Sequence, residues 1–245
     1  MLFRSGVDDL SSGLKSTLEA HLDHSNFTSK PISITDQRIA SVFKDFKPDI
    51  IFHLAAKSGV ATSVLDPVFS DLTNVNGSVN ILDAARLSGA KRLVFSSSSS
   101  VYGGGGDLPS KEGSSLSPKS PYALQKLVVE KYCQLYSSIH SLDTICLRYF
   151  NIFGPRQRPD SAYAAVVAAF IEAERTGASP VIFGSGEQFR DFTYVKNAVC
   201  ANILAANSKN NFYGEALNIG AGGTLSVNDL CKIICSRKPE YLPGR

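Results

Sequence analysis

Short apolar runs alternate with longer amphipathic segments along the first 150 residues. Apolar, β-rich runs predict strands at 31–34, 49–54, 92–95 and 144–147, and helical periodicity predicts helices at 36–46, 67–88 and 121–139. This alternation is typical of βαβ units that build a parallel sheet. Ile50, Ile51 and Phe52 are apolar at consecutive positions, which predicts that helices cover both faces of the sheet.

The pattern changes after Asn151, where loops rich in glycine and proline separate shorter elements. Helices are expected at 164–176, 197–206 and 227–235, and strands at 181–183 and 216–219. A capping-box-like pattern from Ser226 to Asp229 predicts the start of the last helix. We therefore predict a doubly wound α/β domain over residues 1–151 and a smaller mixed α/β lobe over 152–245. Parts of 192–206 are expected to pack back on the first domain.

Composition narrows the class of protein. The 245 residues are 43% hydrophobic, enough for a packed core, and the net charge of +3 is spread along the chain, which argues against a nucleic-acid partner. No apolar stretch approaches the roughly 20 residues of a membrane span, and the first residues lack the apolar core of a signal peptide. Five cysteines without a framework spacing favour a cytoplasmic location, and we expect no metal site.

Two carboxylates, Asp8 and Asp9, stand where a strand of the sheet is expected to end. In a doubly wound fold an acid at this place hydrogen-bonds a ribose and disfavours a 2′-phosphate, so the pair favours NAD over NADP. A solvated turn ahead of a helix is the structural alternative. A glycine-rich turn for the pyrophosphate should precede Asp8 by roughly 20 residues, but only seven residues are there. Gly103–Gly106 is no substitute, because it leads into a polar loop.

The segment from His53 to Ala56 follows the next expected strand. Its small residues would let the main chain approach a cofactor closely. The alternative is a packed strand end in which a backbone group satisfies His53.

Tyr122 and Lys126 form the strongest chemical signal. Four residues apart, they share one face of a helix that Ser120 and Pro121 begin. The ammonium group and the positive helix end are expected to lower the pKa of the phenol from about 10 toward neutrality, where it can serve as general base and acid. A hydroxyl of the run Ser96–Ser100, at the end of the strand before this helix, can relay a proton to the phenol. A helical Tyr and Lys without a role remain the alternative for the pair alone.

Several strings together resemble the extended short-chain dehydrogenase/reductases, within the NAD-dependent epimerase/dehydratase family. They are HLAAKSG, VFSSSSSVYG, PYALQK, LRYFNIFGPRQ and GSGEQFRDFTYV. The resemblance is strongest to UDP-glucose and UDP-N-acetylglucosamine 4-epimerases, and it implies a Rossmann-like fold with an incomplete first βαβ unit, truncated at both ends. It also implies an NAD-binding domain, a sugar-nucleotide lobe, and a homodimer that pairs through the helices near 67–88 and 121–139.

The resemblance assigns roles by position. The catalytic residues are Ser98, Tyr122 and Lys126. The residues implied for NAD are Asp8, Asp9, Leu10, Ser11, Ser12, Gly13, Ser33, Ile34, Leu54, Ala55, Ala56, Lys57, Ser58, Thr73, Tyr122, Lys126, Tyr149 and Phe150. Those implied for a UDP-sugar are Ser98, Tyr122, Asn151, Ala165, Val166, Phe183, Arg190 and Arg245. Arginine suits a diphosphate because its fork binds phosphate oxygens bidentately. A local ion pair with Asp191 is the alternative for Arg190.

The residues after Ser98 narrow the reaction. Related dehydratases and decarboxylases carry an acid in the string before Val-Tyr-Gly, whereas Ser99 and Ser100 stand here. Without that acid no group is evident to remove a ring-carbon proton, so hydride chemistry at C4 is expected. Three departures from the family pattern are Ser33 near adenine, Lys196-Asn197 after Tyr-Val, and Val181 near uracil. A UDP-glucuronate 4-epimerase, another sugar-nucleotide enzyme and a catalytically inactive fragment remain alternatives. The position that gates the C2 substituent is expected beyond Arg245.

Overall fold

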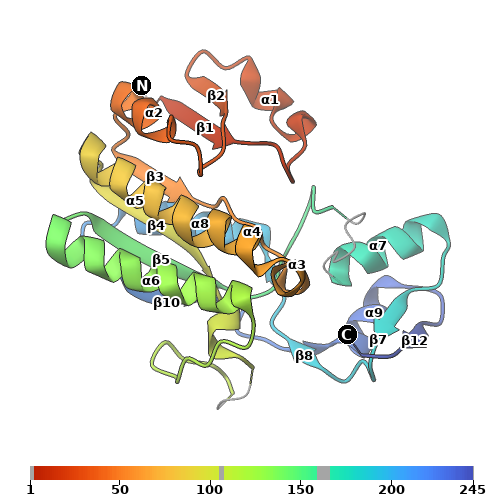
Figure 1. Cartoon of the computed structure of the whole chain (residues 1–245). Helices are drawn as coiled ribbons and strands as arrows, with labels where there is room; N and C mark the ends of the chain where they lie inside the picture. Colours follow the sequence, from red (N-terminus) through yellow and green to blue (C-terminus); the bar gives the residue numbers. More distant parts are fainter. Residues whose placement is uncertain (1–2, 105–107, 159–165, 245) are drawn as a thin grey trace. The chain divides into compact units, whose positions relative to one another are not determined.

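The computed structural model describes residues 3–104, 108–158 and 166–244 (Figure 1). The chain divides into two compact units. The first unit comprises residues 1–148 and 202–217, and the second comprises 149–201 and 218–245. Helix α8 (Val195–Asn207) belongs to both units.

Parallel strands form the centre of the first unit. Its four-stranded sheet has the order β10 (Glu215–Ile219), β5 (Asp143–Tyr149), β4 (Arg92–Ser98) and β3 (Ile50–His53). Strands β3 and β4 are parallel, with Ile50 opposite Arg92. This is a Rossmann-like α/β arrangement, as predicted.

A separate parallel pair joins β1 (Arg4–Asp8) to β2 (Phe27–Pro31), with Arg4 opposite Phe27. The strand expected at 31–34 therefore lies earlier in the chain and ends at Pro31. Proline has no N–H for a ladder hydrogen bond, and the chain turns immediately afterwards, where the Ile32 N–H donates to the Lys30 carbonyl at 3.0 Å. Ile32 and Ile34 are buried in the core instead.

Helices lie against the four-stranded sheet, with α5 (Gly77–Ser88) and α6 (Pro121–His140) on one face and α8 on the other (Figure 1). The helix expected at 67–88 is divided into α4 (Pro67–Asp71), a π-helical turn η2 (Leu72–Asn76) and α5. The remaining helical segments of this unit are η1 (Lys15–Thr17), α1 (Glu19–Leu22), α2 (Ile39–Phe46), α3 (Val60–Leu65) and η3 (Ser99–Tyr102). Among the helices of the described residues, none combines the length and apolar character that crossing a membrane requires.

Burial differs between the strands. In β5 every residue before Tyr149 is buried, and in β4 Leu93, Val94 and Phe95 are almost fully buried, as expected for a sheet covered on both faces. At β3 that prediction is wrong, because Ile50 and Phe52 are 37% and 44% exposed. Ile50 and Phe52 lie on the same face of the strand, so this face of β3 is exposed while the face of Ile51 and His53 is buried.

The second unit has a small core of its own. Val167 and Phe170 from α7 (Val166–Thr176) pack with Ile182 from β7 (Val181–Phe183) and with Leu230 from α9 (Val227–Ile234). Ser226 caps α9, with its hydroxyl accepting from the Asp229 N–H at 3.0 Å, which confirms the predicted helix start. The short strands pair as β6 (Ile152–Phe153) with β9 (Thr193–Tyr194), β8 (Phe189–Arg190) with β11 (Leu225–Ser226), and β7 with β12 (Glu240–Leu242). The strand expected at 216–219 is β10, which joins the four-stranded sheet rather than the lobe.

Candidate active site

Ser98 is the last residue of β4 and the N-cap of η3. Its hydroxyl oxygen accepts from the Ser100 N–H at 3.2 Å and from the Ser100 hydroxyl at 2.9 Å. The strand therefore ends in a tight turn that presents the hydroxyl at the carboxyl edge of the sheet, where ligands of open α/β folds bind.

Tyr122 and Lys126 lie in the first turns of α6. Ser120 caps this helix, and the Ser63 hydroxyl accepts from the Tyr122 N–H at 3.0 Å. Ser98 lies near enough to the phenol of Tyr122 to act on its pKa, and the Lys126 ammonium lies 5.8 Å from the Tyr122 ring centre. The structure thus brings together the three residues that the sequence predicted to meet.

Lys126 is buried, with 3% of its surface exposed. Its ammonium donates to the Ser96 carbonyl at 2.6 Å and lies 4.7 Å from the Phe95 ring centre. Burial lowers the pKa of Lys126 to about 8, although the nearby Cys146, Cys133 and Glu130 act in the opposite direction.

The pKa of Tyr122 differs from the prediction. Burial raises this pKa above the ordinary value near 10, and the hydrogen bond with Ser98 opposes the rise without cancelling it. The prediction of a phenol near neutrality is wrong for this structure, because the loss of hydration outweighs the hydrogen bond.

The acidic turn after β1 is organised by its own main chain. Asp8 accepts from the Leu10 N–H at 2.6 Å, and Asp9 accepts from the Ser11 N–H at 2.9 Å. The Ser11 hydroxyl also donates to Asp9, and these hydrogen bonds lower the pKa of Asp9. Leu10 has a left-handed backbone with φ of 57°. Asp8, Leu10 and Gly13 line a small cavity of about 150 Å³. Both carboxylates are exposed, as a role in binding a ribose hydroxyl requires.

Lys57 connects this turn to the segment after β3. Its ammonium donates to the Ser11 hydroxyl at 2.6 Å and lies 5.3 Å from the Phe69 ring centre. Leu54 and Ser58 in the same segment are exposed, while Ala55 and Ala56 are half-buried. Two of the expected cofactor segments therefore lie side by side.

The other residues implied for NAD are held inside the fold. The Ser33 hydroxyl lies 3.0 Å from the Thr35 hydroxyl, and Ile34 is buried against Gly77. Thr73 donates to the Phe69 carbonyl at 3.3 Å within the π-helical turn. Tyr149 ends β5, and the Phe150 N–H donates to the Ile219 carbonyl at 3.1 Å. Their contact with a cofactor stays a prediction.

His53 is a structural residue. It is 3% exposed, and its Nε2 lies 2.7 Å from the Ser78 hydroxyl. Burial, and secondarily the charge of Lys126, lowers the pKa of His53 to about 3. His53 therefore belongs to a packed strand end. Its partner is the side-chain hydroxyl of Ser78 and not a backbone group.

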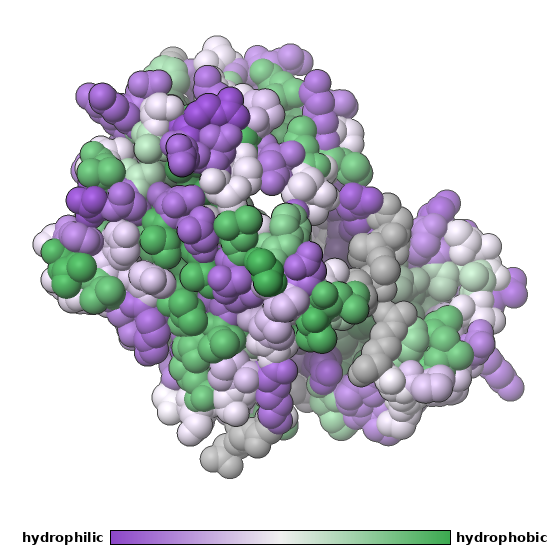
Figure 2. All heavy atoms as spheres, in the orientation of Figure 1, coloured by the Kyte–Doolittle hydropathy of each residue, from purple (hydrophilic) through white to green (hydrophobic). Residues whose placement is uncertain are grey.

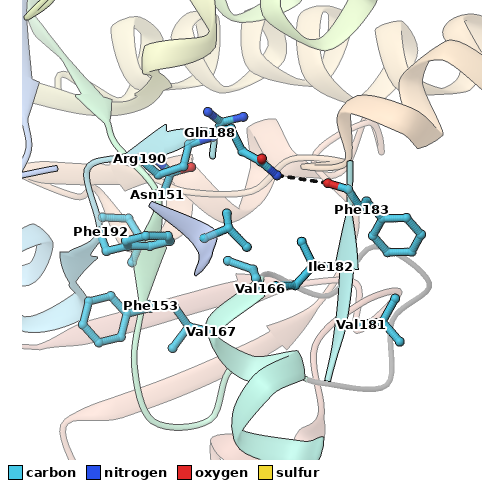
Figure 3. A pocket seen from close by; sticks show the side chains of 12 residues that line it. Asn151, Phe153, Val166, Val167, Val181, Ile182, Phe183, Gln188, Arg190 and Phe192 are labelled. Atoms are coloured by element: carbon cyan, nitrogen blue, oxygen red, sulfur yellow. Dashed lines mark hydrogen bonds between the residues drawn. The ribbon is translucent and has the colours of Figure 1, made fainter. Parts of the chain in front are cut away.

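A cavity of about 290 Å³ lies inside the second unit (Figure 3). Asn151, Gln188 and Arg190 gather at one side of it, and the rest of the lining is apolar. The lining residues are Asn151, Ile152, Phe153, Val166, Val167, Val181, Ile182, Phe183, Gln188, Arg190, Phe192 and Val227. An apolar wall with a few convergent polar groups is typical of a small-molecule site.

Four residues of this lining were implied for the UDP-sugar, namely Asn151, Val166, Phe183 and Arg190. Ala165 and Arg245, also implied, lie outside the described residues. Phe153, Phe192 and Gln188 were not expected, because isolated aromatic and amide residues in short loops carry no periodic signal. Gln188 donates to the Phe183 carbonyl at 3.1 Å, which fixes one side of the cavity.

Arg190 is not a member of a local ion pair with Asp191. The Asp191 carboxylate instead accepts from the N–H groups of Ala221 and Gly222, both at 2.9 Å, and from the Thr193 hydroxyl. Within the described part of the chain, no carboxylate lies at ion-pair distance from Arg190. Its guanidinium is exposed and suited to an anionic ligand.

The first unit fits a dinucleotide in the residues that the structure describes. An ammonium group has three N–H donors, and over these residues buried Lys126 makes one hydrogen bond, to Ser96. Ribose hydroxyls are suitable acceptors for the others. The exposed carboxylates of Asp8 and Asp9 likewise accept from hydroxyls at the far end of a dinucleotide.

Comparisons with known proteins agree with this geometry. The chain is 37% identical to the UDP-glucose 4-epimerase of Mycolicibacterium smegmatis over 98% of this chain and 78% of the relative. It is similar in structure to the UDP-N-acetylglucosamine 4-epimerase from Methanobrevibacter ruminantium M1 in complex with UDP-N-acetylmuramic acid, with TM-score 0.92 and 39% identity over 98% and 77% of the two chains. The UDP-glucuronic acid 4-epimerase from Bacillus cereus, in complex with UDP-glucuronic acid and NAD, has TM-score 0.87 and 29% identity over 98% and 78%.

A family model covers most of the chain. The model of the NAD dependent epimerase/dehydratase family matches residues 5–220, which includes the acidic turn, Ser98, Tyr122 and Lys126. The positions of these residues, the Rossmann-like sheet and the relatives all agree with this match. The chain belongs to the NAD dependent epimerase/dehydratase family, whose cofactor is NAD.

Proposed function

We propose that the protein interconverts UDP-hexoses that differ in configuration at C4, either UDP-glucose and UDP-galactose or their N-acetylated counterparts. The observation that carries this proposal is that Ser98 and Tyr122 lie close together beside the buried ammonium of Lys126. Hydroxyl, phenol and ammonium are the groups needed to move one proton at a sugar hydroxyl.

Each group has a distinct task in this scheme. Tyr122 accepts the proton of the C4 hydroxyl. It returns this proton after the 4-keto sugar has rotated in the site and presents its opposite face. Ser98 orients that hydroxyl and relays the proton, while Lys126 binds the cofactor ribose. The hydride chemistry belongs to NAD when it is bound, because no protein side chain accepts a hydride.

The cavity of the second unit is our candidate for the uridine diphosphate. Arg190 and Asn151 suit the diphosphate oxygens, and Phe183 and Val166 suit the uracil side. The proposal also includes the other substrate contacts that the family resemblance implies, among them Ala165 and Arg245.

Product analysis tests the function. Purified protein is incubated with NAD and UDP-glucose, UDP-N-acetylglucosamine or UDP-glucuronate in turn, and products are resolved by NMR. Tyr122→Phe should lower kcat about a hundredfold or more, whereas Tyr132→Phe, which removes a phenol hydroxyl from the same helix, should not. Conversion of the uronate alone identifies the alternative 4-epimerase. Conversion that survives Tyr122→Phe would refute the mechanism.

A catalytically inactive fragment that binds UDP but not NAD is the other alternative. Calorimetry with NAD and with UDP separates the two cases. Tight NAD binding supports the enzyme, and UDP binding without NAD binding supports the fragment.

We also propose that the protein forms a homodimer through α4 and α6. Apolar side chains gather on the face of the molecule that these helices present (Figure 2). Val68, Phe69 and Leu72 are 78%, 51% and 49% exposed, and Leu124 on α6 is 52% exposed. Such a surface is typical of an interface. A monomer in light scattering would refute the dimer.

A further inference from the structure

Glu130 and Arg148 form a buried ion pair in the first unit. Arg148 donates through Nη2 to Oε2 at 2.7 Å and through Nε to Oε1 at 2.9 Å, and the two side chains are 2% and 5% exposed. Desolvation makes such pairs costly, and apolar replacements of similar size are often equally stable. Stability alone therefore explains this pair poorly.

Arg148 Nη1 also donates to the Glu112 carbonyl at 3.4 Å, and two further hydrogen bonds of the pair go to both ends of the turn that carries Ser98. The Ser97 hydroxyl donates to Glu130 Oε1 at 2.5 Å, and Arg148 Nη1 donates to the Tyr102 hydroxyl at 2.8 Å. Ser97 directly precedes Ser98, and Tyr102 is the last residue of the η3 turn that Ser98 caps. One ion pair thus holds the chain on both sides of the hydroxyl.

The same pair is attached to the helix of the phenol. Tyr122, Lys126 and Glu130 follow one another at intervals of four residues, so they lie on one face of α6. Arg148 in turn belongs to β5, next to β4 in the sheet. The ion pair therefore joins the strand that carries Ser98 to the helix that carries Tyr122.

We propose that Glu130 and Arg148 are positioning residues that hold the Ser98 hydroxyl against the phenol of Tyr122. They act through Ser97 and Tyr102 and do not touch the substrate. The expected loss of turnover rests on the proposed function, whereas the expected displacement of the Ser98 hydroxyl does not. Proton relay between two hydroxyl groups depends steeply on their separation, so a small displacement of Ser98 lowers turnover.

Ser97→Ala is the test variant, because it releases one end of the turn and leaves every charge in place. In its crystal structure the Ser98 Oγ and Tyr122 Oη atoms should lie farther apart than in the crystal structure of the wild-type protein. Turnover should fall about tenfold with KM unchanged. Ser97→Thr keeps the hydroxyl donor and should restore both.

Ser137→Ala is the matched control. Ser137 is a buried serine of the same helix, and its hydroxyl donates to the Leu142 carbonyl at 2.7 Å. This control should change the melting temperature but neither kcat nor the Ser98–Tyr122 separation.

Two outcomes for Ser97→Ala contradict the proposal. An unchanged separation in Ser97→Ala overturns it, and so does a lower melting temperature with wild-type kcat. If Ser97→Ala does not fold, Tyr102→Phe releases the other end of the turn and is judged by the same criteria. If the wild-type protein shows no epimerase activity, the proposed function fails, and the crystallographic separation still decides the positioning role.

Discussion

The side-chain amide of Asn74 is hydrogen-bonded to the main chain of Lys57 on both sides. Its Oδ1 accepts from the Lys57 N–H at 2.7 Å, and its Nδ2 donates to the Lys57 carbonyl at 3.0 Å. The same Nδ2 donates to Gln125 Oε1 at 2.9 Å. Asn74 thereby connects the segment after β3 to α6, where Gln125 directly precedes Lys126. It lies in the π-helical turn, a feature that is frequent at functional sites.

Asn74→Ala should weaken both the fold and cofactor binding. The substitution leaves the Lys57 N–H and carbonyl without their partner, and an unsatisfied buried polar group costs about 1 to 3 kcal/mol. Urea denaturation should show a loss of this size, and calorimetry should show weaker NAD binding. Asn76→Ala is the control, because Asn76 lies exposed in the same turn. Equal effects of the two substitutions would contradict the prediction.

Arg92 stabilises the end of α8. Its guanidinium donates to Asp143 at 2.6 Å and to the carbonyls of Ala205, Ser208 and Asn210 at 2.7, 2.8 and 2.7 Å. Because Arg92→Met leaves the Asp143 carboxylate buried beside open carbonyls, we expect a loss of about 3 to 5 kcal/mol in the free energy of unfolding.

The neighbouring Lys91 provides the comparison for Arg92. Lys91 pairs with Asp49 at 2.8 Å on the surface, where both side chains are more than 70% exposed. Lys91→Met should change stability by less than about 1 kcal/mol. If thermal unfolding shows similar losses for the two variants, the carbonyl contacts of Arg92 contribute nothing measurable.

The sequence predicted the elements that have a strong periodic signal. Strand β7 lies where it was expected, and α6 ends within one residue of its expected bounds. The meeting of Ser98, Tyr122 and Lys126 also followed from the sequence, because the end of a strand and the first turn of the next helix are neighbours in a βαβ unit.

Other features depend on contacts between distant residues and left no local signal. Asn74 and Gln125 are 51 residues apart in the sequence, and their side chains meet only when the helical segments that carry them pack together. The pKa of Tyr122 could not be predicted from the neighbouring Lys126, because burial, which sequence spacing does not report, is the dominant cause. The exposed face of β3 likewise depends on which elements pack against the sheet, and the local sequence does not report this.

Gly103 and Gly104 offer a controlled test of the turn after Ser98. Both have left-handed backbones, with φ of 72° and 69°. A Cβ atom on Gly103 would lie 1.9 Å from the Ser117 carbonyl oxygen, whereas one on Gly104 would meet nothing within 4 Å. Gly104→Ala should therefore lower the free energy of unfolding only by the cost of a left-handed backbone at alanine, about 1 to 2 kcal/mol. Gly103→Ala should lower the free energy of unfolding clearly more, as measured by urea denaturation. Equal losses for the two variants would show that the turn can shift to accommodate the Cβ atom without further loss of stability.

The buried His53 should make the free energy of unfolding fall as the pH is lowered. Its pKa is about 3 in the folded protein and about 6.5 when unfolded, so between these values the unfolded chain binds the additional proton. The contribution is fully present above pH 6.5 and is lost as pH falls toward 3.

Between pH 7 and pH 5 this loss amounts to about 2 kcal/mol in the free energy of unfolding. His53→Gln keeps a partner for the Ser78 hydroxyl and removes the titrating group, so its stability should depend less on pH over this interval by that amount. His140→Gln, which removes an exposed imidazole at the end of α6, controls for the loss of a histidine. Urea denaturation at both pH values measures the difference. If wild type and His53→Gln lose the same stability, His53 is not kept neutral by burial, and the acid sensitivity has another origin.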